Sequence, residues 1–384
     1  MSRTWDVAII GAGYVGLPLA QTFAEADQRV LVVDVVPALV ESINAGRSHI
    51  EDVSDADLGP LVAAGKISAT SDYEQLKQAN AILIALPTPL TKQRVPDLSY
   101  VEAAARGIAA VLETGQLVVL ESTTYPGTTR EVVKPILEEG SGLVAGKDFN
   151  LAMSPERVDP GRTDWTTKTT PKVVGGLTAE CTTAAAAVYR TAIDTVHEVS
   201  APESAELTKL LENIYRSVNI ALVNELAQLC DRMGIDVWEV VEAAATKPFG
   251  FQSFQPGPGL GGHCIPIDPY YLSWKAREYD FSARFIDLAG EVNNNMPYFC
   301  RSVISQAMNH GAQRSISGSK ILIIGVAYKA DIGDMRETPA EKLIELLKTA
   351  GANVSYHDPH VPEFDEMTSA ALEPESYDCV AIVT

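Results

Sequence analysis

The chain has 384 residues, of which 46% are hydrophobic and 21% charged, the composition of a globular protein with room for two or three domains. Its 50 acidic residues outnumber its 30 Lys and Arg residues, and the formal net charge of −20 argues against partners such as nucleic acid or an anionic membrane surface. Any phosphate-bearing ligand must therefore be held by backbone amides or by a few focused cations.

The N-terminal residues lack the basic and apolar regions of a signal peptide, and no apolar run approaches the ~20 residues of a membrane span. We therefore expect a cytoplasmic protein. The five cysteines are odd in number and have no paired spacing, so neither a disulfide framework nor a metal site is predicted. They are Cys181, Cys230, Cys264, Cys300 and Cys379.

Strand and helix signals alternate from the first residues, which is typical of a parallel sheet covered by helices. A strand over residues 7–10, a helix over 16–26 and a strand over 30–33 form one β-α-β unit. Further strands are expected at 81–86, 117–120 and 150–153, with a helix at 101–112. We place the end of this first domain at residue 200.

A glycine-rich segment follows the first strand and opens the first helix, which is the context that a dinucleotide-binding fingerprint requires. Gly11 permits a tight turn, Gly13 lets the backbone approach a pyrophosphate, and Gly16 permits close helix packing. Asp34 ends the second strand, where a carboxylate binds a ribose and repels a 2′-phosphate, so NAD is favoured over NADP. The predicted cofactor residues here are Gly11, Gly13, Tyr14, Val15, Gly16 and Asp34.

Three later loops follow strand ends, where doubly wound sheets bind ligands. Pro87 with Thr88, and Thr123 in the next loop, are predicted to line the cofactor. Glu156 and Arg157 follow the strand at 150–153 and are candidate ligand-binding residues. An ordinary loop salt bridge is the alternative interpretation there.

One long helix is predicted over residues 202–233, with Gly234 as its C-terminal cap. At 1.5 Å per residue, about 30 residues span ~45 Å, enough to join two domains and offer a face to a second copy of the chain. Lys209 and Asn213 are four residues apart and share one helix face. Facing a pocket they could hold an oxyanion and lower the pKa of a thiol; otherwise they are solvated surface residues.

A loop rich in glycine and proline over residues 257–269 carries Cys264. Its glycines give a ligand close access, and Asp268 can orient a water molecule or the thiol. Cys264 is therefore the candidate nucleophile, and His263 is assigned a positioning role. The other four cysteines are expected to serve packing.

A second α/β region begins at residue 320, with strands expected at 321–324, 354–357 and 379–383 and a helix at 339–350. It has no glycine fingerprint. Tyr328 and Lys329 follow its first strand and Arg336 comes shortly after, and the two cations could hold phosphate. Because residue 384 lies in or just after a strand, we expect a further C-terminal segment.

Taken in chain order, five motifs resemble those of the UDP-glucose/GDP-mannose dehydrogenase family. They are the fingerprint at 11–16, Ser-Pro-Glu-Arg at 154–157, the Lys209 to Asn213 helix, Gly-Gly-His-Cys at 261–264, and Tyr328-Lys329 with Arg336. The resemblance implies an α/β fold of two Rossmann-like doubly wound domains joined by a long central helix. These are an NAD domain at 1–200, a dimerising region at 201–300 and a UDP-binding domain at 301–384.

The same resemblance implies a four-electron oxidation at C6 of a nucleotide sugar, from alcohol through aldehyde and thioester to carboxylate, with two NAD per turnover and a homodimer formed through the central helix. Cys264 would form the thiohemiacetal, Lys209 would stabilise oxyanions, and Asn213 would donate to the same oxygen. Asp268 would assist the thiol and the hydrolytic water.

The remaining roles implied by the resemblance concern the ligands. Thr123 and Glu156 would hold the water and the catalytic lysine, and Arg336 would reach toward NAD. The residues implied for substrate binding are Glu156, Arg157, Lys209, Asn213, Gly259, Gly261, Tyr328 and Lys329.

Departures from the pattern of UDP-glucose oxidisers indicate the branch. His263 and Ile267 stand where those enzymes commonly have Ser and Lys, and Arg157 and Pro160 replace an apolar residue and a second Glu. These features resemble the branch acting on UDP-N-acetylhexosamines, with UDP-N-acetylglucosamine first, for surface polysaccharide. The alternatives are a UDP-glucose or UDP-N-acetylmannosamine 6-dehydrogenase, a β-hydroxyacid-type dehydrogenase, and a non-catalytic NAD-binding module. Pro160 is left without a role.

Overall fold

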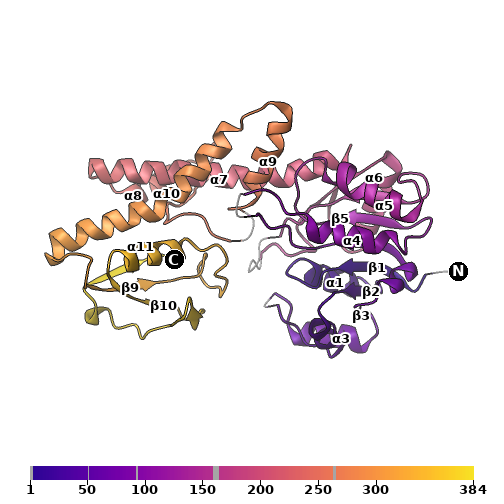
Figure 1. The fold of residues 1–384 in the computed structure, drawn as a ribbon, viewed down its shortest axis with the longest axis horizontal. Coiled ribbons are helices and arrows are strands. Elements are labelled where there is room, and N and C mark those ends of the chain that lie inside the picture. Colours follow the sequence, from indigo (N-terminus) through magenta and orange to yellow (C-terminus); the bar gives the residue numbers. More distant parts are fainter. Residues whose placement is uncertain (1–2, 51, 92–93, 159–163, 263–264) are drawn as a thin grey trace. The chain divides into compact units, whose positions relative to one another are not determined.

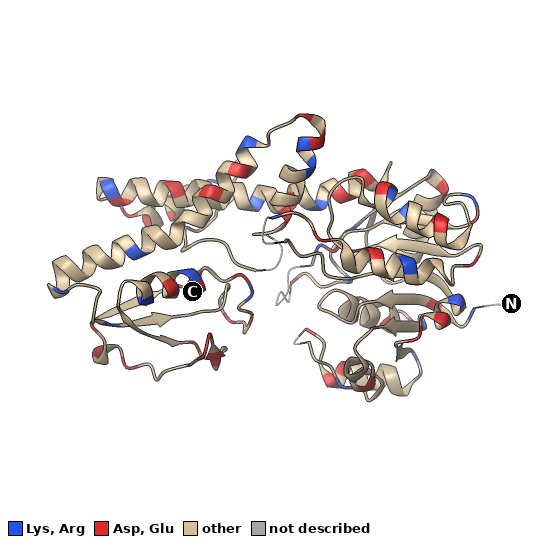
Figure 2. Ribbon diagram, in the orientation of Figure 1, with Lys and Arg blue, Asp and Glu red and all other residues tan. Residues whose placement is uncertain are grey.

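The computed structural model describes residues 3–50, 52–91, 94–158, 164–262 and 265–384. The chain divides into two compact units, Met1–Leu211 and Glu212–Thr384 (Figure 1). Acidic and basic residues are interspersed along the helices of both units (Figure 2).

The first unit is built on one eight-stranded sheet, in the order β3-β2-β1-β4-β5-β6-β7-β8. All neighbouring strands are parallel except β6 and β7, which are antiparallel. The strands are β1 (Trp5–Ile10), β2 (Val30–Val33), β3 (Ile67–Thr70), β4 (Ala79–Ile84), β5 (Leu117–Leu120), β6 (Asn150–Met153), β7 (Lys172–Gly176) and β8 (Val196–Val199).

Most of the predicted strands of this sheet are confirmed, and β2, β5 and β6 have the predicted bounds. The strand expected at 81–86 is β4 and ends two residues earlier. The reason is local: the Leu86 N–H donates to the Ser122 hydroxyl at 3.0 Å instead of continuing the ladder. The antiparallel β6–β7 pair departs from the parallel sheet that the alternating pattern predicts.

Helices cover both faces of this sheet. Alternate residues of a strand point to opposite faces, so Val7 and Ile9 of β1 pack in one apolar core and Ala8 and Ile10 pack in the other. Helices α1, α2, α3 and α6 contribute to the first core, and α4 and α5 to the second. Their bounds are α1 (Gly16–Glu25), α2 (Pro37–Asn44), α3 (Asp55–Ala63), α4 (Ser99–Ala109), α5 (Lys134–Ser141) and α6 (Ala179–Tyr189).

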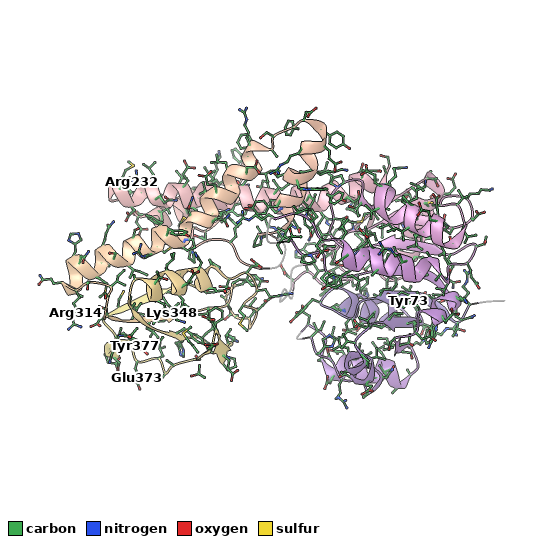
Figure 3. The ribbon with its side chains drawn as sticks, viewed as in Figure 1. Tyr73, Arg232, Arg314, Lys348, Glu373 and Tyr377 are labelled. Carbon is green, nitrogen blue, oxygen red and sulfur yellow. The ribbon has the colours of Figure 1, made fainter. Side chains whose placement is uncertain are left out.

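One side-chain contact illustrates how tightly the second core is packed. Tyr73, which is labelled in Figure 3, lies on a short 3-10 helix, η1 (Tyr73–Gln78). Its ring packs against Gly107 of α4. A Cβ atom at Gly107 would lie 2.6 Å from the ring, so no larger residue fits there without displacing the tyrosine.

The long helix is confirmed with the predicted bounds, as α7 (Pro202–Met233). Gly234 adopts a left-handed φ of +67°, and the N–H of Ile235 donates to the carbonyl of Cys230 at 2.9 Å. These are the features of a glycine C-cap.

The second unit contains most of α7, the helices that follow it and a three-stranded parallel sheet in the order β10-β9-β13. The strands that the sequence predicts at 354–357 and 379–383 are confirmed as the two neighbours of β9. The helices are α8 (Val237–Ala245), α9 (Asp268–Ala276), α10 (Arg284–Ala307) and α11 (Pro339–Thr349). The strands are β9 (Lys320–Ile324), β10 (Asn353–His357) and β13 (Cys379–Ile382), with a hairpin of β11 (Glu363–Phe364) and β12 (Met367–Thr368).

Candidate functional site

The glycine turn after β1 has the local geometry that its sequence predicts. Gly11 has a φ of +104°, and a Cβ atom there would lie 2.5 Å from the Ala85 carbonyl oxygen. A Cβ atom at Gly16 would lie 1.9 Å from the Gly11 carbonyl oxygen, whereas one at Gly13 would meet nothing within 4 Å. The turn and the close packing are thus confirmed, and Gly13 faces open space where a pyrophosphate has room to approach.

Asp34 lies directly beside this turn. Its Oδ2 accepts the Ala12 N–H and its Oδ1 accepts the Val36 N–H, both at 2.9 Å. Helix α1 begins with no side-chain cap and no acidic residue in its first turn, as far as the described residues show. The N–H groups of that turn and the positive end of the helix dipole therefore suit an anion here.

The loops after β4 and β5 are tied to each other. The Thr88 hydroxyl donates to the Thr123 carbonyl at 2.7 Å, and the Ser122 hydroxyl donates to the Leu86 carbonyl at 2.7 Å. Because Ala85 also touches Gly11, the predicted cofactor segments adjoin one another where the strand order reverses between β1 and β4. Such a switch point is where open α/β sheets bind ligands. The buried hydroxyl of Thr124 has no partner among the described residues.

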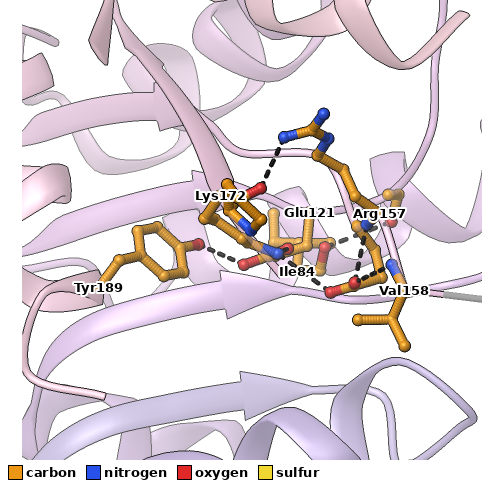
Figure 4. Close-up of polar contacts among 9 residues, drawn as sticks. Ile84, Glu121, Arg157, Val158, Lys172 and Tyr189 are labelled. Carbon is orange, nitrogen blue, oxygen red and sulfur yellow. Dashed lines mark hydrogen bonds and ion pairs between the residues drawn. The ribbon is translucent and has the colours of Figure 1, made fainter. Parts of the chain in front are cut away.

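A buried charged network, which the sequence analysis did not predict, lies at the ends of β5, β6 and β7 (Figure 4). The Lys172 Nζ lies 2.6 Å from Glu121 Oε2 and 3.0 Å from Glu156 Oε2. The Tyr189 hydroxyl donates to the other oxygen of Glu121. The sequence signals for this network were weak, namely a lysine that opens an apolar strand and a glutamate that follows one.

Glu156 is held from both sides. Its Oε1 accepts the N–H groups of Arg157 and Val158, each at 2.7 Å, while Oε2 binds Lys172. Glu156 thus holds Lys172, which the sequence analysis did not name, and its expected contact with the catalytic lysine, Lys209, stays a prediction. Glu156 does form a salt bridge, as the alternative interpretation expects, but its partner is a buried lysine of β7 rather than a loop residue.

The electrostatics of the network follow from burial and the single ammonium. Burial opposes ionisation of Glu156, but the Lys172 ammonium and the two backbone N–H groups outweigh it and hold its pKa below the ordinary value. Burial raises the pKa of Glu121 even though Lys172 opposes the shift. Burial also disfavours the charged Lys172, yet the two carboxylates together raise its pKa.

Lys209 is buried on α7, so its interpretation as a solvated surface residue is wrong. One turn earlier, the Glu206 carboxylate accepts the N–H groups of Gly127 and Thr129, at 2.6 and 2.8 Å, and the Thr129 hydroxyl at 2.7 Å. These bonds fasten the start of α7 to the segment that follows β5. Burial raises the pKa of Glu206 to about 7, against the lowering effect of its hydrogen bonds.

In the second unit, the Asn213 amide donates to the Asp268 carboxylate, and Arg216 donates to the Asn213 carbonyl oxygen. Asn213 and Asp268 are both buried, and Asp268 is the first residue of α9. Two predicted site residues that are 55 positions apart thus meet, and Arg216 is a neighbour that the sequence analysis missed. His263 and the predicted nucleophile Cys264 lie outside the described residues, as does Pro160.

The glycine-rich loop before α9 packs against the segment after β9. The Gly262 N–H donates to the Arg336 carbonyl at 3.1 Å, and a Cβ atom at Gly261 would lie 2.4 Å from the Cβ of Tyr328. Gly259, at a φ of +144°, faces Pro339. The predicted substrate residues of this loop and Tyr328 are therefore neighbours.

Within the same unit, a cavity of about 320 Å³ opens beside this loop. Its lining includes Gly259, Tyr270, Asn293 and Thr338. The guanidinium of Arg336 binds the Asp334 carboxylate, with Nε at 2.9 and 3.1 Å from its two oxygens. The predicted reach of Arg336 toward NAD stays a prediction.

The turn that follows β9 repeats, with a single glycine, the geometry of the turn that follows β1. Gly325 has a φ of +82°, and its N–H donates to the His357 carbonyl at 2.9 Å. Asp358 follows β10 as Asp34 follows β2, and its Oδ2 accepts the N–H groups of Val326 and Ala327 at 2.9 and 3.2 Å. This carboxylate shapes the turn that leads into Tyr328 and Lys329.

The four other cysteines are buried or partly buried, as expected for cysteines that serve packing. Cys181 and Cys230 are buried, and Cys300 and Cys379 are partly buried against the apolar core of the second unit. Burial raises the pKa of the Cys300 thiol to about 11, which disfavours a reactive thiolate.

The described residues offer neither a metal cluster nor a membrane span. No group of three or more His, Cys, Asp or Glu side chains among them could hold a metal ion. No helix among them is both long and apolar enough to cross a membrane.

Three models of one family match the chain in order. They describe the NAD binding domain, the central domain and the UDP binding domain of the UDP-glucose/GDP-mannose dehydrogenase family, and match residues 5–193, 203–295 and 322–384. Protein CapL of Staphylococcus aureus is 39% identical over 92% of this chain and 82% of its own.

Two further relatives carry names that state a substrate. The UDP-N-acetyl-D-mannosamine dehydrogenase of Pyrococcus horikoshii is 36% identical over 98% of this chain and 88% of its own, and a solved structure of that enzyme matches with a TM-score of 0.91 over 99% of this chain and 89% of that one. The UDP-N-acetyl-D-glucosamine 6-dehydrogenase of Pseudomonas aeruginosa is 35% identical over 96% of this chain and 86% of its own.

Proposed function

The chain belongs to the UDP-glucose/GDP-mannose dehydrogenase family, and on that premise we propose that it oxidises C6 of a UDP-N-acetylhexosamine to the carboxylate. UDP-N-acetylglucosamine is the substrate that the sequence analysis predicts, and the relative from P. aeruginosa supports it. UDP-N-acetylmannosamine is the second candidate, supported by the relative from P. horikoshii.

The observation that carries the proposal is the buried contact between Asn213 and Asp268. It joins α7 to the first residue of α9, directly after the loop that contains Cys264. An amide and a carboxylate at this place suit a reaction that forms oxyanions and needs a positioned proton acceptor.

Bound NAD would supply the hydride acceptor for both oxidations, held by the turn at Gly11 and Gly13 and by Asp34. In our proposal the C6 alcohol first loses a hydride and its hydroxyl proton and becomes an aldehyde. The Cys264 thiolate adds to that aldehyde and, with a proton, forms a thiohemiacetal. The thiohemiacetal loses a second hydride and its hydroxyl proton and becomes a thioester. Water then cleaves the C–S bond, releasing the carboxylate and restoring the thiol. The balance is two NAD reduced for each sugar.

The other proposed site residues stabilise the oxyanions, hold the hydrolytic water or bind the uridine diphosphate. The buried Lys209 stabilises the oxyanions, and Asp268 takes a proton from the thiol or the hydrolytic water. Thr123 and Glu156 hold that water. The uridine diphosphate is bound by Tyr328 and Lys329, beside Gly259 and Gly261.

A substrate panel tests the reaction. UDP-glucose and the UDP derivatives of N-acetylglucosamine, N-acetylgalactosamine and N-acetylmannosamine are each supplied with NAD, and NADH is counted per sugar. We expect two NADH with one N-acetyl sugar. One NADH per sugar, or no NADH with any of the four, would contradict the proposal.

A cysteine variant separates this reaction from a single-step β-hydroxyacid-type oxidation. Cys264→Ala removes the thiol that the thioester route requires, so we expect carboxylate formation to stop. Cys300→Ala is the matched control, since that thiol lies against the core of the second unit. Unchanged NADH release by Cys264→Ala would exclude the thioester route.

A further inference from the structure

The buried network around Lys172 connects residues of two strand ends and one helix to Glu156, which follows a third strand, β6. Glu121 follows β5, Lys172 opens β7, and Tyr189 ends α6. The Glu121 N–H donates to the Ile84 carbonyl at 2.9 Å, which fixes its backbone to β4. The network is therefore anchored in the sheet rather than in a surface loop.

Lys172 is held more closely by Glu121 than by Glu156, at 2.6 against 3.0 Å. Tyr189 occupies the other oxygen of Glu121, so both oxygens of that carboxylate are engaged by buried donors. The side chains of Lys172 and Glu121 are 4% and 0% exposed, against 14% for Glu156. Glu156 is thus the member of the network that reaches toward solvent.

We propose that Lys172 is a positioning residue for the reaction: it fixes the carboxylate of Glu156 at the strand ends, and Glu121 and Tyr189 hold Lys172 in place. This inference rests on the proposed function, in which Glu156 holds the hydrolytic water. Rotation of Glu156 would break its bond to Lys172 and its two bonds to backbone N–H groups.

The charges support this arrangement. Two carboxylates share one ammonium, and within the part of the chain that the structure describes, Lys172 and Glu121 are the charged groups that act on Glu156, with Tyr189 behind them. Loss of the ammonium would leave two buried carboxylates uncompensated, and the pKa of Glu156 would rise.

A double-mutant cycle tests the inference on the full chain. Lys172→Gln and Glu156→Gln are each expected to lower kcat about tenfold or more, and the double variant should be no slower than Glu156→Gln alone. The KM for NAD should stay within about twofold of the wild-type value. Lys172→Arg should restore most of the activity, and the acid limb of the kcat profile should move to higher pH in Lys172→Gln.

Lys66→Gln is the matched control, because it removes an ion pair of the same length, 2.6 Å to Asp27, from the surface of the same unit. If Lys172→Gln does not fold, Lys172→Gln with Glu121→Gln keeps the net charge of the network and enters the cycle instead. Wild-type kcat in the Lys172 variants, or additive losses, would overturn the inference while leaving the proposed function standing. Absence of NADH release by the wild type with every UDP-sugar would overturn both.

Discussion

Glu206 is a buried carboxylate that fastens α7 to the segment after β5, and its protonation is linked to stability. Its folded pKa of about 7 lies above the ordinary value of 4.5, so the folded state binds the proton more tightly than the unfolded state. Its contribution to stability is therefore complete below pH 4.5 and is lost as the pH rises through about 7.

We expect the free energy of unfolding of the wild type, relative to Glu206→Gln, to fall by up to ~3 kcal/mol between about pH 4.5 and pH 8. Urea unfolding of both proteins at several pH values measures this difference. Groups common to both proteins cancel in the comparison. A difference that is flat or rises with pH would contradict the assignment.

Two glycines of the turn after β1 are expected to respond differently to substitution by alanine. Gly13→Ala places a Cβ atom in open space, so we expect an unchanged melting temperature but a KM for NAD raised about tenfold or more. Gly16→Ala drives a Cβ atom into the Gly11 carbonyl, so we expect a large loss of stability. Thermal unfolding and NAD titration distinguish the two, and equal effects of both substitutions would refute this interpretation.

At the scale of elements, the loop before α9 depends on its contact with Tyr328. Gly261→Ala would force the loop away from that side chain, and we expect the KM for the UDP-sugar to rise about tenfold with little change in the KM for NAD. Gly257→Ala is the matched control, because a Cβ atom there meets nothing within 4 Å. Steady-state kinetics of both variants measure these KM values. A similar KM for the UDP-sugar in Gly261→Ala and Gly257→Ala would argue against a role of this loop in substrate binding.

The elements that the sequence predicted are those with strong local patterns. The apolar run of β2 and the long repeat of α7 need no distant contact to be recognised. Strand β8 was missed because His197 and Glu198 interrupt its apolar pattern, and β7 begins with a buried lysine. Lys172 and Glu121 meet because the sheet places β7 next to β6 and β6 next to β5. Local sequence patterns do not predict this order of strands.

At the scale of the whole molecule, α7 presents an exposed apolar stripe, and we expect a second copy of the chain to cover it. Leu222, Leu226, Leu229 and Met233 are spaced by four, three and four residues and are all exposed. Residues at this spacing share one helix face. We therefore expect a homodimer through α7, and Leu226→Glu should shift it to the monomer in analytical ultracentrifugation.

The net charge of the chain predicts that the expected dimer depends on ionic strength. Two chains of −20 repel each other, and salt screens this repulsion while leaving the burial of apolar side chains favourable. The dimer should therefore tighten as ionic strength rises from about 0.01 to 0.15 M, over which the Debye length falls from ~30 to ~8 Å. Sedimentation at several salt concentrations measures the dissociation constant. Weaker association at higher salt would mean that ion pairs, rather than the leucine stripe, hold the two copies together.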